Sequence, residues 1–338
     1  MSLNVLYPDS RSELLDIEAK VFGADTTLLN PRKSSFAAID LASWENCDGI
    51  VVARIQMDKT VAPHLKKCRI IVRNGVGYDN CDLELLGAAG IAVCNVPDYG
   101  TTEVADTAVA MMLAFARGTA IYDATLRQDP TALWTHTHNV TARRLRGATY
   151  GVIGMGRIGT ASALRARAFG MNVVFYDPAL SIGAELSFGF TRANKLDDLL
   201  KVADVITIHA PLTPETNKMI NADAVSKIKP GAYLISTARG PICDTGALLE
   251  GLKSNRLLAV GLDVLPSEPA TLDDPLVKAW QANEPWLRGR VLMGPHSGFY
   301  SPDSLVDLRT KAAQTACWYL KDNKLVNCVN AEFLKKPR

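Results

Sequence analysis

The feature that most constrains the fold is a regular alternation between short β-branched segments and segments long enough for a helix. A first series of predicted strands covers residues 4–7, 49–54, 69–73 and 91–96. A second series covers residues 149–153, 172–176, 205–209, 232–237, 259–264 and 290–293. Because parallel strands must be joined by long crossover connections, this alternation predicts two doubly wound α/β units with parallel sheets.

Two long helices are expected to join the two series. Residues 101–127 carry apolar side chains at helical spacing, and a second helix begins after Ser301 as N-cap, with Pro302 at the first helical position. A length of 338 residues also favours two domains, since single cores stop growing at roughly 250–300 residues. We predict a discontinuous domain of residues 1–100 and 301–338 and a continuous domain of residues 101–300.

The composition excludes several classes of protein. The chain is 48% apolar and 21% charged, as in globular α/β proteins. Its net charge is +2 with scattered basic residues, so no nucleic-acid partner is expected. The N-terminus does not read as a signal peptide, and the longest apolar run, residues 109–116, is far shorter than the ~20 residues of a membrane span. We therefore expect neither export nor a membrane span.

The cysteines and histidines indicate a reducing compartment and no metal. Seven cysteines are widely spaced and include no Cys-x-x-Cys pair, which predicts reduced thiols and a cytoplasmic location. His136 and His138 alone do not make a metal site, because a third ligand is lacking.

A glycine loop stands where a strand is expected to meet a helix. Gly154, Gly156 and Gly159 follow the predicted strand 149–153 and open a helical segment. In this context the three glycines allow a tight turn, a close approach of backbone N–H groups to a pyrophosphate, and close packing of helix on strand. The next predicted strand ends at Asp177, where a carboxylate can accept hydrogen bonds from ribose hydroxyls and would repel a 2′-phosphate. The cofactor predicted is NAD.

Further polar residues follow the later strands of the second series. Arg239, Glu268 and His296 come after the predicted strands 232–237, 259–264 and 290–293, and Asp263 falls within the second of these. Open α/β sheets bind ligands beyond the carboxyl ends of their strands, so these residues are expected in one crevice. Taken singly, each residue has a structural alternative. Arg239 could form a surface ion pair, Glu268 could be a solvated carboxylate in a turn, and His296 could be a hydrogen-bonded residue at a strand end.

Together these side chains suit the reduction of a 2-oxo acid. A guanidinium such as that of Arg239 can hold the substrate carboxylate and polarise its carbonyl. An imidazole such as that of His296 suits proton transfer near neutral pH, and Glu268 suits orientation of the imidazole and support of its charged form.

The same motifs, in order and spacing, resemble the D-isomer-specific 2-hydroxyacid dehydrogenases over nearly the whole chain. They are the loop 154–159, Asp177, and residues 236–240, 261–264, 268–269 and 295–298. Residues 71–80, 91–97, 175–178 and 327–330 look most like the C-terminal-binding-protein branch, although that branch has Trp where this chain has Phe299.

The resemblance implies a Rossmann cofactor domain, a flavodoxin-like substrate domain and an active-site cleft between them. It implies that Arg239 binds substrate, that Glu268 pairs with His296 and that His296 is the acid/base. The cofactor contacts it implies, with Asp263 at the nicotinamide carboxamide, are Gly154, Gly156, Arg157, Ile158, Gly159, Tyr176, Asp177, His209, Ala210, Pro211, Thr216, Thr237, Ala238, Arg239, Asp263 and His296. Substrate contacts are expected at Arg73, Asn74, Gly75, Val76, Gly77 and Phe299.

The predicted function is that of an NAD-dependent oxidoreductase, acting on CH–OH donors, that moves a hydride between nicotinamide and a small D-2-hydroxy/2-oxo acid. One alternative is an NAD(H)-sensing corepressor or scaffold of the C-terminal-binding-protein type, which we favour less because no tail or linker is appended. Another is a phosphoglycerate dehydrogenase, which needs a phosphate-binding cluster that the sequence does not reveal. The aperiodic residues 128–146 and the resemblance predict a homodimer built on the cofactor domain.

Overall fold

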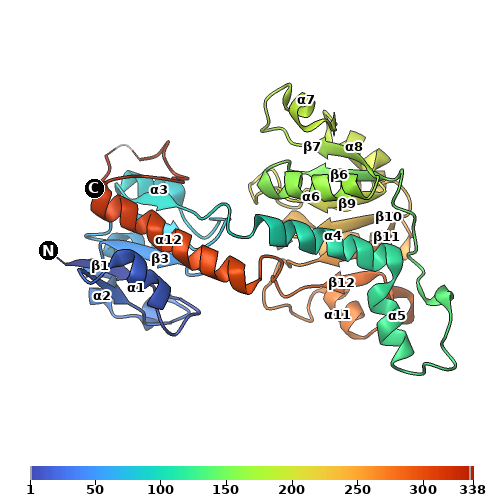
Figure 1. Cartoon of the computed structure of the whole chain (residues 1–338), viewed down its shortest axis with the longest axis horizontal. Coiled ribbons are helices and arrows are strands. Elements are labelled where there is room, and N and C mark those ends of the chain that lie inside the picture. The colour runs from blue at the N-terminus through green and yellow to red at the C-terminus, as the bar shows by residue number, and fades with distance from the viewer. Residues whose placement is uncertain (1, 335) are drawn as a thin grey trace. The chain divides into compact units, whose positions relative to one another are not determined.

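The chain folds into two compact α/β units. The structure is a computed structural model that describes residues 2–334 and 336–338. Unit 1 comprises residues 1–100 and 301–338, and unit 2 comprises residues 101–300. Figure 1 shows the C-terminal helix, in red, packed among the blue N-terminal elements of unit 1.

Unit 1 is built on a five-stranded parallel sheet. Its strands are β1 (Leu3–Leu6), β2 (Thr26–Leu29), β3 (Gly49–Val52), β4 (Ile70–Arg73) and β5 (Ala92–Cys94), in the order β2-β1-β3-β4-β5. This is the flavodoxin-like order expected from the resemblance. Its helices are α1 (Asp16–Phe22), α2 (Leu41–Asn46), α3 (Leu83–Ala88) and α12 (Pro302–Asp322).

Helix α12 covers one face of this sheet together with α1. Ser301 caps its N-terminus with a reciprocal capping box, and Pro302 occupies the first turn, as predicted. A Cβ on Gly49 would lie 2.9 Å from Leu320 Cδ1, so glycine at the start of β3 lets α12 approach the sheet closely. The opposite face packs a second apolar core that includes Trp44 and Leu86 of α2 and α3.

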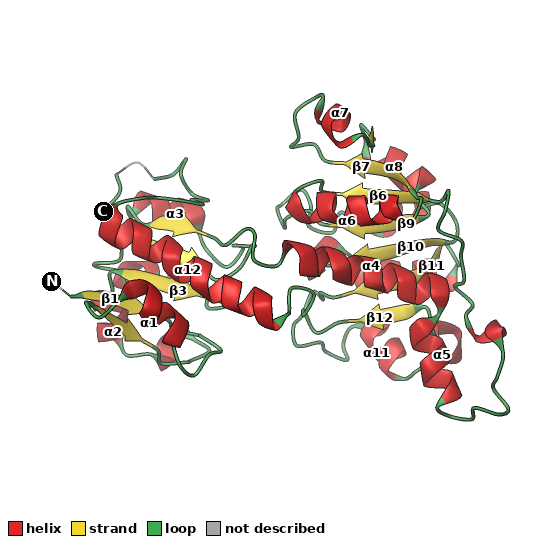
Figure 2. Cartoon of the chain, viewed as in Figure 1, coloured by secondary structure: helices red, strands yellow, loops and turns green. Residues whose placement is uncertain are grey.

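Unit 2 is built on a seven-stranded parallel sheet with helices on both faces (Figure 2). Its strands are β6 (Thr149–Ile153), β7 (Asn172–Tyr176), β8 (Thr191–Arg192), β9 (Val205–Ile208), β10 (Ala232–Ser236), β11 (Leu257–Leu262) and β12 (Val291–Met293). Its helices are α4 (Thr101–Arg117), α5 (Thr119–Leu126), α6 (Arg157–Ala168), α7 (Ala184–Phe188), α8 (Leu196–Val202), α9 (Ala222–Lys227), α10 (Thr245–Lys253) and α11 (Pro275–Gln281). The order β12-β11-β10-β9-β6-β7-β8 is the doubly wound order with one added strand, which confirms the predicted fold class.

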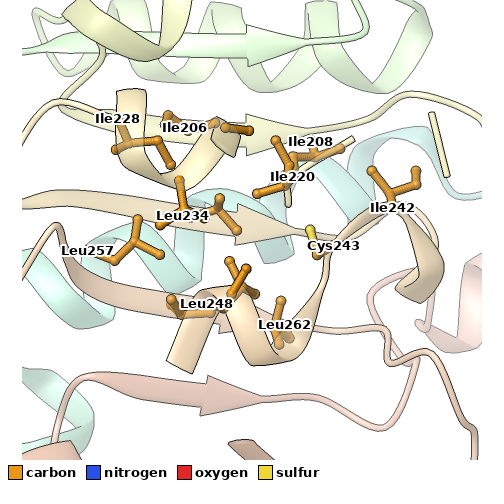
Figure 3. Packing of buried hydrophobic residues seen from close by; sticks show 14 of the residues in the cluster. Ile206, Ile208, Ile220, Ile228, Leu234, Ile242, Cys243, Leu248, Leu257 and Leu262 are labelled. Carbon is orange, nitrogen blue, oxygen red and sulfur yellow. The ribbon is translucent and has the colours of Figure 1, made fainter. Parts of the chain in front are cut away.

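Two apolar cores cover the two faces of the unit 2 sheet. Helices α4 and α6 pack on one face, around Phe115 and Tyr233. The other face packs side chains of α8, α9 and α10, and Figure 3 shows Leu234 of β10 between Ile206 and Leu248. The central strands are buried on both faces, and this explains their continuous apolar sequences.

The structure corrects several predictions about secondary structure. The strands β2 and β8 were not expected from the sequence: β2 is a partly exposed edge strand and β8 has only two residues, so neither carries a strong apolar pattern. The predicted single helix over residues 101–127 is wrong. Gly118 has a left-handed φ of +69° and separates α4 from α5 with a bend of 59°.

Residues 128–146, which lacked periodicity, form a loop that contains only a short 3-10 turn, His136–His138. Within the described residues, no single helix is both long and apolar enough to cross a membrane. The bent pair α4 and α5 passes that test only when the two are joined, and most apolar side chains of α4 are buried in the core of unit 2.

An ion pair between α12 and α1 allows a test of how unit 1 is held together. Arg309 Nε and Nη2 donate to the two oxygens of Glu18 at 2.9 and 2.7 Å, and the Glu18 side chain is only 3% exposed. Arg309→Ala leaves that carboxylate buried without its cation. We expect a loss of about 3 kcal/mol in the free energy of unfolding, measured by urea denaturation.

The control is Asp16→Asn, because Asp16 also contacts Arg309 but is largely exposed and should change the midpoint little. Adding Glu18→Gln to Arg309→Ala removes the uncompensated charge and should recover part of the loss. If Arg309→Ala and Asp16→Asn have equal effects, the buried pair is not what stabilises this contact.

Candidate functional site

The glycine loop between β6 and α6 has the geometry of a phosphate-binding turn. Gly154 has a φ of +87°, and a Cβ there would lie 2.7 Å from Ala210 N. A Cβ on Gly159 would lie 2.1 Å from Gly154 O, so only glycine allows the helix to sit this close to the strand. A Cβ on Gly156 would meet no atom within 4 Å, and its backbone therefore borders open space.

Helix α6 directs its N-terminus at this open space. Its first hydrogen bond runs from Thr160 N to Gly156 O at 2.9 Å, so the N–H groups of Arg157, Ile158 and Gly159 lie in the first turn, where a helix offers no acceptor. N–H groups and the helix dipole both favour an anion there. The loop therefore fits the pyrophosphate of a dinucleotide, as the sequence predicted.

Asp177 follows β7 and lies against the glycine loop. Its Oδ2 accepts a hydrogen bond from Met155 N at 2.8 Å, and its Oδ1 accepts one from Ala179 N at 2.9 Å. In addition, Gly154 N donates to Tyr176 O at 2.9 Å, which ties the end of β7 to the turn. The carboxylate is thereby held beside the loop that would carry the pyrophosphate.

The loop after β9 closes the other side of the glycine turn. His209 Nε2 lies 2.9 Å from Thr207 Oγ1, and Nδ1 lies 3.4 Å from Thr237 Oγ1. Burial lowers the pKa of His209 to about 3, so this imidazole is neutral near pH 7. The following residues turn through Thr216, whose hydroxyl donates to Pro211 O at 2.7 Å.

Asp263 lies one residue beyond β11, and not within the strand as predicted, because β11 ends at Leu262. Its side chain is buried, and both oxygens accept backbone N–H groups, from Ser297 at 3.0 Å and from Gly298 at 2.7 Å. Burial raises the pKa of Asp263, and the two N–H donors lower it in part. The carboxylate therefore organises the loop that carries His296.

His296 and Glu268 form a direct pair in unit 2. Glu268 Oε2 lies 2.7 Å from His296 Nδ1, and Glu268 Oε1 accepts a hydrogen bond from Leu265 N at 3.1 Å. Burial raises the pKa of Glu268, but the hydrogen bond and charge of His296 bring the net pKa below its ordinary value. Glu268 is thus an anion near neutral pH, and Nε2 is the imidazole nitrogen left to exchange a proton.

Arg239 is brought to this pair by the residue that follows it. A Cβ on Gly240 would lie 1.9 Å from the carbonyl carbon of Leu265, so the loop after β10 packs directly on the loop that holds Glu268. Arg239 Nη1 donates to Ala238 O at 2.9 Å, and the positive charge of Arg239 lowers the pKa of Glu268 further. The structure thus brings Arg239, Glu268 and His296 together.

Phe299 lies beside the histidine, with its ring 6.4 Å from that of His296 and nearly perpendicular to it. The other expected substrate residues are in unit 1, where residues 74–77 form the loop after β4. Gly75 has a φ of +148°, and a Cβ there would lie 1.7 Å from Arg73 Nη1. Val96 N donates to Gly75 O at 3.0 Å and supports this loop from the segment after β5.

Sequence reasoning missed the roles of two positions. Gly240 and Leu265 help to position the pair of Glu268 and His296 through backbone contacts. Such contacts leave no pattern in the sequence of side chains. The only signal was Gly240 itself, directly after the arginine.

A glycine loop, a helix N-terminus and a strand-end carboxylate on a doubly wound sheet define a dinucleotide-binding domain. The family model described as "D-isomer specific 2-hydroxyacid dehydrogenase, NAD binding domain" matches residues 109–298. The chain belongs to this family, and the predicted resemblance at family level is confirmed. The narrower C-terminal-binding-protein branch stays a prediction.

Relatives and solved structures support the same assignment. The chain is 33% identical over 293 residues to D-3-phosphoglycerate dehydrogenase of Mycobacterium leprae, covering 86% of this chain and 53% of that protein. It therefore spans about half the length of the curated relatives it matches. It resembles D-lactate dehydrogenase of Aquifex aeolicus in complex with NAD and lactic acid, with a TM-score of 0.81, 28% identity and coverage of 95% of this chain and 96% of that one. A glyoxylate reductase of Paecilomyes thermophila matches with a TM-score of 0.83, 25% identity and coverage of 97% and 98%.

Asp177 provides a test of cofactor choice. Asp177→Ala should weaken NADH by about 10-fold or more, the scale of a lost charged hydrogen bond. NADPH should be weakened less, because the substitution also removes the repulsion of its 2′-phosphate. Both affinities are measured by fluorescence titration. Asp177→Ala also removes the hydrogen bond from Met155 N, but that loss affects both cofactors and so drops out of the ratio of the two affinities. The exposed Asp198→Ala is the control. Equal weakening of both cofactors would show that Asp177 does not contact the ribose.

Proposed function

We propose that the protein is an NAD-dependent oxidoreductase that interconverts a small D-2-hydroxy acid and the corresponding 2-oxo acid. The observation that carries the proposal is the 2.7 Å pair of His296 and Glu268, formed next to Arg239 in an NAD-binding domain. An ionised carboxylate beside an imidazole supports a charged acid/base, and a guanidinium supports binding of an anionic substrate.

The proposed roles follow from the chemistry of each side chain. When bound, NADH supplies the hydride that reduces the carbonyl carbon. His296 Nε2 gives its proton to the carbonyl oxygen, while Glu268 orients the ring and stabilises its charged form. Arg239 binds the substrate carboxylate and polarises the carbonyl. The residues 154–159, Asp177 and the loop after β9 hold the cofactor.

Phosphoglycerate dehydrogenase is a second candidate, favoured by the likeness to the Mycobacterium leprae protein. The Mycobacterium leprae protein and the two solved structures carry the names of enzymes that act on hydroxy or oxo acids. This favours an enzyme over a corepressor. The deciding experiment is a panel of pyruvate, glyoxylate, hydroxypyruvate and 3-phosphohydroxypyruvate assayed with NADH. Selective reduction of the phosphorylated acid would establish the second candidate. No reduction of any of them, with NADH still bound, would overturn the proposal.

The pair of Glu268 and His296 predicts a specific pH dependence. Reduction consumes the imidazolium, so its rate should fall as pH rises, and oxidation should rise over the same range. Glu268→Gln keeps the shape of the side chain but removes the anion that favours the charged ring. Both inflections should therefore move to lower pH. The measurement is turnover against pH in each direction.

Two further variants serve as controls for that measurement. Glu250→Gln, a carboxylate on the surface of α10, should leave the inflections in place. His296→Gln should cost on the order of 10²–10⁴ in turnover while NADH still binds. If the inflections of the pH profiles are unchanged in Glu268→Gln, Glu268 does not support the charged form of His296.

We further propose a homodimer formed through residues 119–146 of unit 2. Helix α5 has no buried residue, and in the loop after it Trp134 is 76% exposed and Val140 is 58% exposed. Beside this loop an open cavity of about 540 Å³ is lined by His138, Val140 and Trp286 among others. A second copy of the chain would cover this apolar surface.

Light scattering at micromolar concentration should therefore give the mass of a dimer. Trp134→Ser should raise the dimer dissociation constant about 30-fold or more, as expected for a central aromatic residue of an interface. Trp280→Ser changes an exposed tryptophan elsewhere in unit 2 and should have little effect. A monomeric wild-type protein would contradict the proposal.

We also propose a cytoplasmic location. Its support is chemical: all seven cysteines are free thiols in the structure, and thiols stay reduced in the cytosol.

A further inference from the structure

Two cysteines of unit 1 face each other across a short pairing of the C-terminal segment with β5. An isolated antiparallel bridge joins Cys94, the last residue of β5, to Cys328. On one side of the pair, Val329 N donates to Val93 O at 2.8 Å. On the other side, a bond of 3.2 Å joins Asn95 N to the carbonyl of the residue before Cys328.

This pattern brings the two side chains close together. The cysteines do not bond to each other through the backbone, so they form the non-hydrogen-bonded type of antiparallel pair, in which the Cα atoms are about 4.5 Å apart and the side chains are nearest. Disulfides span Cα separations of about 4.4–6.8 Å. The expected Cα separation of Cys94 and Cys328 therefore lies within the range that a disulfide can span.

The two thiols are unequal in exposure and acidity. Cys94 is fully buried, and Cys328 is partly exposed. The contact with Cys94 lowers the pKa of Cys328 and raises the pKa of Cys94. Cys328 Sγ also donates to Asn330 Oδ1 at 3.3 Å. Cys328 is the sulfur that an oxidant can reach, and it attacks as the thiolate, which is the reactive form. The buried thiol lies next to it.

We propose that Cys94 and Cys328 form a redox-sensitive dithiol, which a peroxide converts to a disulfide that fastens the C-terminal segment to β5. The Cys328 thiolate attacks one peroxide oxygen, the O–O bond breaks, and a sulfenic acid and hydroxide form. The Cys94 sulfur then displaces the sulfenic hydroxyl, which leaves as water with the Cys94 thiol proton. The two thiols lose two electrons in total, and the peroxide gains them.

The disulfide would covalently fix the C-terminal segment, which already packs against β5. Asn330, two residues after Cys328, is fully buried: its Oδ1 accepts from Val93 N at 2.8 Å and its Nδ2 donates to Ile91 O at 3.0 Å. The residues after Cys94 support the loop after β4, through the bond from Val96 N to Gly75 O. Oxidation therefore adds a covalent link, reversible by a reductant, to these non-covalent contacts.

The other cysteines supply contrasts. Cys47 and Cys68 are also neighbours, since burial and a hydrogen bond with Cys47 both raise the pKa of Cys68, but both cysteines are fully buried. An oxidant cannot reach them as it can Cys328. Cys317 on α12 is partly exposed, like Cys328, and serves as the matched control.

The test treats the reduced, full-length protein with a slight excess of hydrogen peroxide, blocks the remaining thiols with an alkylating agent, and identifies linked peptides by mass spectrometry. The expected product is a Cys94–Cys328 linkage that forms in the wild type and in Cys317→Ser, disappears in Cys328→Ser and is reversed by dithiothreitol. Recovery of Cys94 in its alkylated form, with Cys328 alkylated or carried on to a sulfinic acid, would overturn the proposal.

Hydrogen exchange provides a second readout that does not depend on any variant. The amides of Val329 and Asn95 form the bonds that flank the pair. They should exchange about tenfold or more slowly in the oxidised protein than in the reduced one, because local opening must then occur within a closed covalent loop. Equal exchange in both states would also count against the proposal.

Discussion

The candidate site depends on one buried carboxylate. His296 has a φ of +55°, a left-handed conformation that costs a residue with a side chain on the order of 1 kcal/mol. Asp263 compensates by bonding to that loop at three points: its carbonyl accepts His296 N at 2.8 Å, and its two carboxylate oxygens accept Ser297 N and Gly298 N. A Cβ on Gly294 or Gly298 would lie 2.3 or 2.7 Å from these oxygens, so the loop closes tightly around them. The conformation of the loop that carries His296 is therefore held by the backbone and carboxylate of Asp263.

The parallel sheet explains why the remaining groups meet at the same place. The strands β10, β11 and β12 are neighbouring parallel strands, so the loops that follow them start from one edge. Proximity of the strand ends is not sufficient, however, because each loop could turn away. Gly240 removes this freedom by its backbone contact with Leu265, whose N–H in turn holds Glu268. The pair of Glu268 and His296, together with Arg239, is therefore positioned mainly by main-chain contacts.

The sequence predicted the parts of the molecule whose pattern is local. Strands buried on both faces, such as β9 and β10, appear as continuous apolar runs, and the glycine loop has a spacing that follows from its geometry. Three features could not be predicted in this way. The edge strand β2 is half exposed, the break at Gly118 depends on contact with Asn139 from a distant loop, and the bonds of Asp263 depend on how two loops fold together. For Gly118 and for Asp263 the contacts join residues that are far apart in the chain.

The position of α12 in the chain has a consequence for biosynthesis. This helix covers the β3–β4 region of unit 1, and its Arg309 neutralises the buried Glu18, yet it is made only after the whole of unit 2. Because a nascent chain emerges from its N-terminus, β3 and β4 leave the ribosome with one apolar face uncovered and must wait for α12. Unit 2 is continuous in sequence and can finish folding within that interval. Unit 1 thus cannot complete its core until α12 has been synthesised, although its first strands are the first part of the chain to be made.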